Sequence, residues 1–474
     1  MSDLIVGNMS GNISYLKIGS WTLPKRGLFV LFGSTLILVA CSLDYSYGNL
    51  NTYVTSYLRK NNPQITYADW VFVSQSKTIF GAILSPFGGE VARRLGIRLS
   101  LIIGSIIYAG GYLLTYFSLD WGLWPVVFTI GAFHGIGYGL TYTPAISSIL
   151  KWFPAHKGTF ASIAVAGYGF GSVIWNPVET AFVNPGNEEA QYPNGTTSGD
   201  KYFTDEDLLG RVPYLFLLIG GSIALMQIIS ILAIRDPSDD EERELLGNMT
   251  ILMEDLVEKE DKSLHSVKPK GAVKTWAFWI FYISFFSMNL LTLFISNYQK
   301  AFGLQFIDDD KFLSLASTLQ NVMNGASRIF WGIIYDKFGY KFTMMFVTCI
   351  STAFAASFGN IVFLEKNSTG VKIFFAVWSC GVYATNPGAY ACFPPQIMKC
   401  FGPKHNATLY GLIFTASIFC SIVLLTVAQT LFPIIGYTGM FAVTGLVGAL
   451  SIVVTLTWRE ELDEEEEVEK KEVI

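Results

Sequence analysis

Long runs of predominantly apolar residues recur along this chain and constrain its fold more than any other feature. Each run is long enough for a helix to cross about 30 Å of hydrocarbon. The sequence therefore predicts an all-α membrane protein with twelve transmembrane helices. The runs lie at about residues 27–56, 68–92, 99–118, 124–153, 158–182, 212–234, 274–302, 312–335, 341–364, 371–398, 407–432 and 438–458.

The composition fits a chain that is solvated mostly by lipid. Of the 474 residues, 51% are hydrophobic and 15% are charged, whereas about 25% are charged in an ordinary soluble protein. So few charges cannot cover a soluble body of this length, and the mean hydropathy is +0.42. This composition excludes a soluble enzyme, a nucleic-acid-binding protein and a disordered scaffold.

One long polar segment separates two groups of six runs. Its acidic start, from Asp236 to Glu244, cannot enter a bilayer. Apolar residues recur at helical spacing from Leu245 to Leu256, so this part is either an amphipathic helix along the membrane face or a solvated connector. The predicted organisation is an N-terminal segment 1–26, a six-helix bundle 27–235, a linker 236–273, a second, pseudo-symmetric six-helix bundle 274–458 and an acidic, solvated tail 459–474.

The distribution of basic residues predicts the orientation in the membrane. Residues 1–24 lack the features of a cleaved signal peptide. If the N-terminus is inside, 22 lysines and arginines lie in inside segments and 8 in outside segments. Positive charge accumulates on the cytoplasmic side, so both termini and the linker are expected there. The plasma membrane is favoured over an organelle membrane.

The two halves carry similar motifs at corresponding places. Residues 151–157 (KWFPAHK), after the fourth run, match residues 399–405 (KCFGPKH), after the tenth. Residues 89–96 (GEVARRLG), after the second run, match residues 332–339 (GIIYDKFG), after the eighth. Such internal repeats indicate duplication and are typical of secondary transporters, in which one half rocks against the other around a central site.

These motifs resemble those of a known family. The Gly-x-x-x-Asp-Lys-x-Gly pattern at residues 332–339 is similar to a cytoplasmic loop of the major facilitator superfamily, although the first copy has Arg93 where an acid is expected. The KWF and HKG triplets at 151–158, with the small residues at 161–171, resemble the fifth-helix signature of the monocarboxylate transporter and oxalate/formate antiporter families. The resemblance covers residues 27–458 and implies the major facilitator fold and a transporter, not an enzyme.

Arg328 is the principal candidate for substrate binding. It lies eight residues before Asp336, about 12 Å into the bilayer at 1.5 Å per residue. Its planar guanidinium stays charged and fits a carboxylate, and the families that the chain resembles use an arginine here for substrate carboxylates. The structural alternative is a salt bridge to Asp44 that joins the first and eighth helices.

Asn324 lies one turn from Arg328, on the same helix face. The resemblance implies an aspartate with a role in proton coupling at this position in animal monocarboxylate transporters, so the amide makes that route doubtful here. It also implies a second cation in helix eleven of oxalate transporters, where this chain has Ser417. A single cation in the C-terminal half favours a monoanion.

Other ionisable residues at membrane depth need a partner, an aqueous cavity or a function. Lys77 either attracts an entering anion or pairs with Asp44. Asp44 and His134 are proton-coupling candidates, with a hydrogen-bonded interhelical histidine as the alternative for His134. Glu179, near the outer end of helix five, is expected at the interface.

Tyrosine and asparagine side chains complete the predicted substrate cavity. Aromatic walls with hydroxyl tips suit a small organic anion. These residues are Tyr47, Tyr142, Asn386 and Tyr390. The sequence shows no nucleotide-binding loop, metal cluster or nucleophile triad at a plausible place, so no cofactor or metal is predicted.

The leading hypothesis is a transporter of a small monocarboxylate that works by alternating access, as proton symport, facilitated diffusion or exchange. Its partners would be the carboxylate, the lipid bilayer and, in the symport case, protons. The runner-up substrate is an amino acid or a carboxylate-bearing vitamin. A non-transporting membrane sensor or partner-binding subunit is the alternative from another class.

Overall fold

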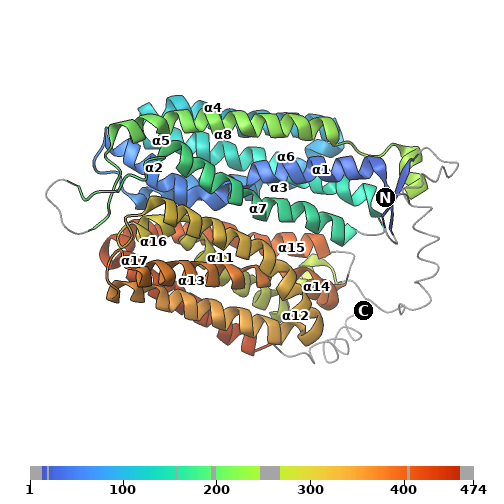
Figure 1. Ribbon diagram of the computed structural model, residues 1–474. Helices are drawn as coiled ribbons and strands as arrows, with labels where there is room; N and C mark the ends of the chain where they lie inside the picture. The colour runs from blue at the N-terminus through green and yellow to red at the C-terminus, as the bar shows by residue number, and fades with distance from the viewer. Residues whose placement is uncertain are drawn as a thin grey trace. The chain divides into compact units, whose positions relative to one another are not determined.

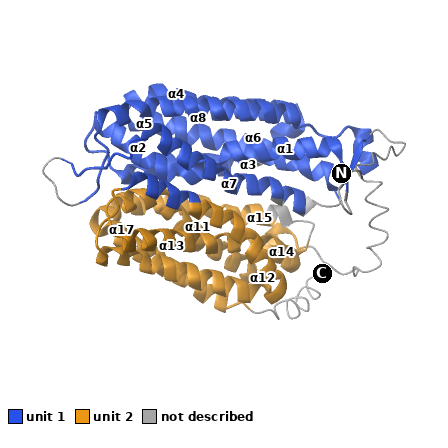
Figure 2. Ribbon diagram, in the orientation of Figure 1, with its two compact units in different colours: residues 1–261, 309–318 blue, residues 262–308, 319–474 orange. Residues whose placement is uncertain are grey.

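The computed structural model describes residues 13–18, 21–154, 157–193, 199–245, 267–402 and 406–458. It divides into two compact units (Figure 2). Unit 1 comprises Met1–Asp261 and Asp309–Thr318, and unit 2 comprises Lys262–Asp308 and Leu319–Ile474. The predictions for the linker beyond Leu245 and for the acidic tail lie outside the described residues.

Unit 1 begins with an antiparallel hairpin and continues as a bundle of long helices that share a common direction (Figure 1). The strands are β1 (Tyr15–Ile18) and β2 (Trp21–Pro24). The main helical elements are α1 (Lys25–Ala40), η1 (Cys41–Ser46), α2 (Tyr47–Arg59), α3 (Trp70–Leu95), α4 (Ile97–Ser118), α5 (Leu123–Val126), η4 (Val127–Ala132), α6 (Phe133–Trp152), α7 (Lys157–Val183) and α8 (Glu206–Ala233); η2 (Tyr67–Asp69) and η3 (Leu119–Trp121) are short.

The second half of the chain repeats this helical composition. Its elements are α10 (Pro269–Ala272), α11 (Trp276–Gly303), α12 (Asp310–Phe358), η6 (Gly359–Phe363), α13 (Thr369–Thr385), α14 (Pro387–Phe401), α15 (Asn406–Phe414), α16 (Ala416–Thr430) and α17 (Phe432–Leu456). The first turns of α12 belong to unit 1 and the rest to unit 2. Gly339 has a φ of 76° inside α12 and divides it into two helices.

The described helices confirm the predicted all-α membrane fold. Eight of them are long and apolar enough to cross a membrane. One of them, α12, is divided at Gly339 and supplies two crossings. Three further crossings are formed by α3, by α7 and by α13 together with α14. The described residues therefore contain twelve crossings, six before the linker and six after it.

Several predicted helices are interrupted rather than continuous. The first crossing contains η1, a 3₁₀ segment, between α1 and α2. Within it, the Ser42 hydroxyl donates to Val39 O at 2.7 Å and the Ser46 hydroxyl lies 2.8 Å from Leu43 O, and such local bonds compete with helical ones. The tenth crossing breaks between α13 and α14 at Pro387, which lacks an N–H.

Glycines allow close contacts between helices. A Cβ added to Gly88 of α3 would lie 2.1 Å from Gly139 O of α6, so these backbones could not approach with larger residues. Gly110 is an exception, because an added Cβ there would meet nothing within 4 Å.

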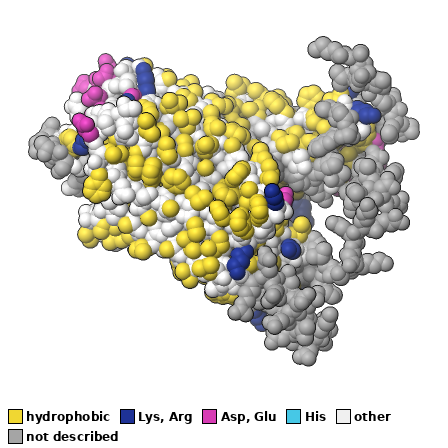
Figure 3. Space-filling model, turned by 60° about the horizontal axis from the view of Figure 1, so that its bottom comes forward, with side chains coloured by type: hydrophobic (Ala, Val, Ile, Leu, Met, Phe, Trp, Pro, Cys, Tyr) yellow, Lys and Arg dark blue, Asp and Glu magenta, His cyan; other side chains and the backbone are white. Residues whose placement is uncertain are grey.

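The outer faces of the helices are apolar. Ile106, Leu232, Ile329 and Leu446 are each exposed by more than 65%. Figure 3 shows hydrophobic side chains over much of one face, with charged side chains gathered toward its ends. In a multi-pass protein such faces are in contact with lipid.

The start of the linker packs against the rest of unit 1. The Trp152 indole donates to Arg235 O at 2.7 Å, and Arg235 pairs with Glu241 at 2.6 Å. Residues 239–245 form a short helix, and Tyr15 of the hairpin donates to Glu244 at 3.2 Å. The first ten residues of the linker are therefore held against the N-terminal half.

Candidate functional site

In unit 1, the interrupted first crossing carries an ion pair. Asp44 belongs to η1, and its Oδ2 lies 2.5 Å from Lys77 Nζ of α3. The Tyr168 hydroxyl of α7 donates to the same oxygen at 2.8 Å. The two charged side chains are 18% and 14% exposed. The structure thus shows the Asp44–Lys77 pair that the sequence analysis offered as one of two roles for Lys77.

Tyrosine rings from two helices surround this ion pair. Lys77 Nζ lies 5.5 Å from the centre of the Tyr138 ring, within the range of a cation–π interaction. Tyr142 lies next to this ring, at 4.9 Å between centroids, and also contacts the Tyr168 ring at 6.2 Å. Tyr142 is therefore part of an aromatic group around Asp44 and Lys77.

His134 is fully buried in unit 1 and enclosed by three tyrosines. The hydroxyls of Tyr47 and Tyr112 lie 2.9 and 2.6 Å from its Nδ1, and that of Tyr108 lies 3.4 Å from Nε2. The imidazole therefore links α6 to α2 and α4. This is the geometry of the hydrogen-bonded interhelical histidine. The Tyr47 hydroxyl, which was predicted to line the substrate cavity, forms one of these hydrogen bonds to His134.

In unit 2, Arg328 and Asn324 lie together on α12. Arg328 Nη2 donates to Asn324 Oδ1 at 3.3 Å. The guanidinium carbon lies 5.9 Å from the centre of the Tyr390 ring of α14. Arg328 is half-buried, whereas its neighbour Ile329 is 71% exposed. Arg328 therefore lies on the inner face of a helix whose opposite face is apolar.

Polar side chains from two further elements, α11 and α16, extend this cluster. The Tyr390 hydroxyl donates to Asn289 Oδ1 at 3.5 Å, and Asn289 Nδ2 donates to the Ser417 hydroxyl at 3.0 Å. Ser417, in the place where a second cation was sought, is thus joined to Tyr390 through Asn289 of α11. Asn386 has a different environment, because its amide donates to Met288 O at 2.8 Å and attaches the α13–α14 break to α11.

Glu179 and Lys300 are more deeply buried than the sequence predicted, and Asp310, which the sequence analysis did not single out, is also fully buried. Glu179 was expected at the membrane interface, but it is fully buried in α7. Its carboxyl lies 2.7 Å from the Ser46 hydroxyl and 2.6 Å from Asn49 Nδ2. Lys300 was counted in an outside loop, but it belongs to α11 and is only 1% exposed. Glu179 and Lys300 both lie inside the predicted apolar runs 158–182 and 274–302, so their place within a run was the signal for burial.

The prediction of a single cation in the C-terminal half therefore needs correction. Lys300 lies in the last turn of α11, which is followed directly by the start of α12. Arg328 lies eighteen residues into α12, about 27 Å along the axis at 1.5 Å per residue. The two buried cations are thus too far apart to bind one small dicarboxylate together.

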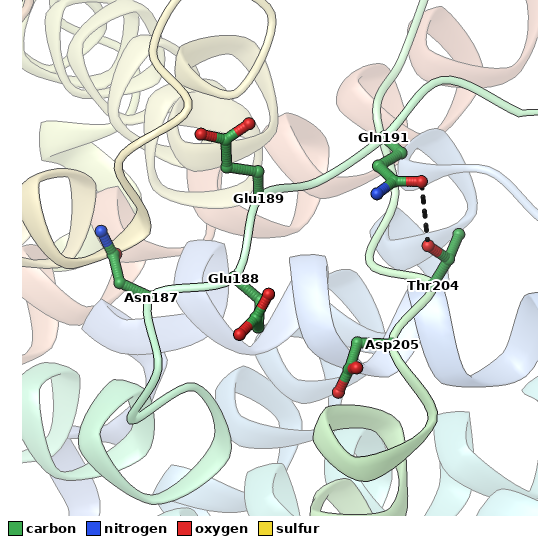
Figure 4. Close-up of a pocket in the computed structure, with 6 residues that line it drawn as sticks. All are labelled: Asn187, Glu188, Glu189, Gln191, Thr204 and Asp205. Carbon is green, nitrogen blue, oxygen red and sulfur yellow. Dashed lines mark hydrogen bonds between the residues drawn. The ribbon is translucent and has the colours of Figure 1, made fainter.

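One pocket lies in the loop between α7 and α8 of unit 1. It has a volume of about 560 Å³ and is lined by Asn187, Glu188, Glu189, Gln191, Thr204 and Asp205. Figure 4 shows Thr204 and Gln191 in contact beside three carboxylates. This acidic surface would repel an organic anion, so it does not suit the substrate class that the sequence predicts.

A second pocket, of about 240 Å³, lies in unit 2 at the Asp336 motif. It is lined by Tyr335, Asp336, Gly339, Tyr340, Gln396, Lys399 and Trp458. The Tyr335 hydroxyl donates to Gln396 Oε1 at 2.9 Å across its wall. Arg328 does not line this pocket, so the pocket is separate from the Arg328 cluster.

Comparison with known proteins gives a consistent result. The family model of the Major Facilitator Superfamily matches residues 36–423 and 309–473. The chain is 26% identical to the apicoplast pyruvate carrier 1 of Toxoplasma gondii, over 91% of this chain and 87% of the carrier. It is 23% identical to the oxalate:formate antiporter of Oxalobacter formigenes, over 84% and 83% of the two chains. A shorter match of 28% identity joins 24% of this chain to 21% of human monocarboxylate transporter 12.

Solved structures show the same fold at low sequence identity. A crystal structure of a D-xylose–proton symporter matches with a TM-score of 0.66 and 14% identity, over 91% of this chain and 96% of the symporter. A POT family transporter in complex with 5-aminolevulinic acid matches with a TM-score of 0.64 and 16% identity, over 91% and 95%.

Proposed function

The chain belongs to the Major Facilitator Superfamily, and from this premise we propose that it carries a small monocarboxylate across a membrane by alternating access. It is a multi-pass membrane transporter and not an enzyme. The observation that carries the proposal is Arg328, a half-buried guanidinium on the inner face of α12. Charge-assisted hydrogen bonds from such a group match the two oxygens of a carboxylate.

The surroundings of Arg328 favour a monoanion. Asn324 contributes an amide and Tyr390 an aromatic face with a hydroxyl, which suit the polar and apolar parts of a small organic acid. Ser417 offers a hydroxyl, not a charge. Lys300 lies in the last turn of α11, before the start of α12, and that start is about 27 Å from Arg328 along the α12 axis. The named substrates of the relatives, pyruvate, oxalate, formate and monocarboxylates, support an organic acid.

Proton symport is the coupling mode that we propose. Asp44 and His134, the candidates from the sequence, are engaged by Lys77 and by three tyrosines respectively. The plasma membrane remains our proposed location. The name of the Toxoplasma relative points to an organelle, and a fluorescent fusion in the source cells distinguishes the two membranes.

The test is uptake into proteoliposomes that contain the purified full chain. Labelled pyruvate should enter and be inhibited by other monocarboxylates, whereas oxalate and alanine should inhibit weakly. Stronger inhibition by alanine would favour an amino acid carrier instead. Absence of uptake of every carboxylate in the panel would refute the proposal.

Replacement of Arg328 tests the binding residue. Loss of one partner of a buried charged hydrogen bond costs about 2 to 5 kcal/mol, or roughly 30-fold to several thousand-fold in affinity. Arg328→Ala should therefore nearly abolish pyruvate uptake. Arg328→Lys keeps the charge but cannot form two parallel hydrogen bonds to a carboxylate, so it should restore little uptake if that geometry is required. Arg98→Ala, which removes an exposed arginine of α4, is the control and should keep wild-type flux.

A further inference from the structure

We propose that Glu179 is the proton-binding site of this transporter, with the Ser46 hydroxyl as a switch between its protonated and ionised forms. The inference rests on the proposed function, because it names the proton carrier for that transport. It begins from the burial of the carboxyl. A carboxylate inside a helical membrane bundle is costly unless a proton or a cation neutralises it, and Glu179 is fully buried.

The hydrogen bonds of Ser46 fit a protonated Glu179. The Ser46 Oγ lies 2.8 Å from Leu43 O and 2.7 Å from Glu179 Oε1. A hydroxyl has one proton to donate, and a backbone carbonyl can only accept. Both oxygens lie within reach of the single Ser46 proton, so it can serve Leu43 O or Glu179 Oε1. When Ser46 donates to Leu43 O, the proton of the Ser46–Glu179 hydrogen bond must come from a protonated Glu179 carboxyl, and both distances are then satisfied by a carboxylic acid.

Asn49 supports the other carboxyl oxygen in both states. Its Nδ2 lies 2.6 Å from Glu179 Oε2, and its Oδ1 accepts from the Thr180 hydroxyl at 3.3 Å. The same Nδ2 donates to Asn176 O at 3.4 Å, and because a carbonyl oxygen can only accept, this contact determines which end of the amide faces Glu179. The N–H group can donate to a carboxylate oxygen or to the carbonyl oxygen of a carboxylic acid.

Ionisation requires only one local rearrangement. When the proton leaves Glu179, Ser46 can rotate its O–H from Leu43 O to Oε1, so the carboxylate receives hydrogen bonds from both Ser46 and Asn49. Hydrogen bonds to the charged form favour that form. The site can therefore hold either protonation state without a change in the helix positions.

The location of the donors connects the proton to helix movement. Ser46 ends η1 and Asn49 lies in the first turn of α2, whereas Glu179 belongs to α7. A shift of the interrupted first crossing against α7 would change both hydrogen bonds and hence the proton affinity. Broken helices have this role in many secondary transporters, where they form the ion sites.

Other titratable groups face this region from the elements packed on α7. Asp44 of η1 is bound to Lys77 of α3, and Tyr53 of α2 donates to Asp310 at 2.5 Å. Arg211 of α8 donates to Val183 O at 3.2 Å, and His134 of α6 contacts three tyrosines. Tyr53 interacts electrostatically with both Asp310 and Glu179.

The experiment separates proton coupling from substrate movement. Full-length protein in proteoliposomes is assayed for pyruvate accumulation driven by a pH gradient and for pyruvate–pyruvate exchange at equal pH. Glu179→Gln keeps a donor toward Ser46 but cannot release a proton. It should lose at least tenfold more accumulation than exchange. Glu188→Gln, which changes an exposed acid in the following loop, should retain both activities.

A second measurement does not depend on transport. Infrared difference spectra of the wild-type protein across a pH titration should show the carbonyl stretch of a buried carboxylic acid, and Glu179→Gln should lack it. Ser46→Ala should shift the midpoint of that titration, and Ser46→Thr should restore it. The proposal is overturned if the band persists in Glu179→Gln, or if this variant accumulates pyruvate as the wild type does. If the wild type moves no carboxylate at all, the proposed function fails, while the infrared titration still decides whether Glu179 binds a proton.

Discussion

At the scale of single residues, charge inside each unit is balanced by local partners. Asp44 has Lys77 and Tyr168, and Arg328 has Asn324 and the ring of Tyr390. These arrangements differ in one respect. The Asp44–Lys77 pair joins opposite charges within unit 1, whereas Arg328 contacts an amide oxygen and an aromatic ring. Both contacts suit a guanidinium that also binds a carboxylate, as we propose for Arg328.

Asn324 offers a test of how Arg328 is used. Asn324→Asp would place a carboxylate one turn from Arg328, so the guanidinium would pair with it and be less available to substrate. We expect a KM for pyruvate at least tenfold higher and a steeper dependence of uptake on external pH, because protonation of the new acid would release Arg328. Initial rates from pH 5.5 to 7.5 measure both effects. Unchanged KM and pH dependence would show that position 324 does not influence the substrate site.

At the scale of elements, the first crossing combines a helix break at η1 with a close contact between helices, and the contact holds the break in place. The α1 helix and η1 pack on α7, where Gly171 faces Ser42. This contact positions η1, which carries Asp44 at one point and Ser46 at another. One short 3₁₀ segment thus presents side chains to both the ion pair and Glu179.

Gly171 should therefore be intolerant of a side chain. A Cβ there would lie 1.9 Å from Ser42 Oγ and 2.8 Å from Val39 O. Gly171→Ala should destabilise the protein by about 1 to 3 kcal/mol, as expected for overpacking, and lower its melting temperature in detergent. Gly221→Ala on α8, where an added Cβ meets nothing within 4 Å, is the matched control. Equal melting temperatures for the two variants would contradict the close contact.

The linker helix should respond to pH through Glu241. Burial alone would raise the pKa of Glu241, but hydrogen bonds from Ser238 and the guanidinium of Arg235 outweigh it and hold the pKa below its usual value. Because the pKa of Glu241 is lower in the docked linker, ionised Glu241 stabilises the docked state at pH values above its ordinary pKa of about 4.3. This stabilisation is lost as the pH falls through the lowered pKa of the docked state.

Amide hydrogen exchange of residues 236–245, corrected for the intrinsic effect of pH, measures this response. Protection should fall in the acid range for the wild type and stay low and pH-independent in Glu241→Gln. Asp239→Asn, which changes an exposed acid of the same helix, should behave like the wild type. Acid-resistant protection in the wild type would show that Glu241 does not hold the linker.

At the scale of the whole molecule, the charge bias predicts that both termini are cytoplasmic. In a variant without its native cysteines, Lys60→Cys and Lys366→Cys should react with an impermeant maleimide added outside intact cells. Asp239→Cys should react only after permeabilisation. Lys366 and Asp239 are both exposed, so access to the reagent depends on the membrane side alone. The reverse pattern would invert the proposed orientation.

The sequence by itself determined the number of crossings, the two repeated halves and the family, because hydrophobic length and short motifs are local properties of the chain. It also placed Arg328 and Asn324 on one helix face, since a separation of four residues implies that arrangement. Helix breaks in η1 and between α13 and α14 were not predicted, because apolar runs are similar in continuous and interrupted helices.

Only the tertiary structure decided which polar groups meet. Glu179 lies more than 125 residues from both Ser46 and Asn49 in the chain, and His134 meets tyrosines from two other helices. A buried side chain takes its protonation state from such partners and from burial, and neither is present in its sequence neighbours. For this reason the sequence identified a transporter, whereas the proposed proton site emerged only from the packing of α7 against the break in the first crossing.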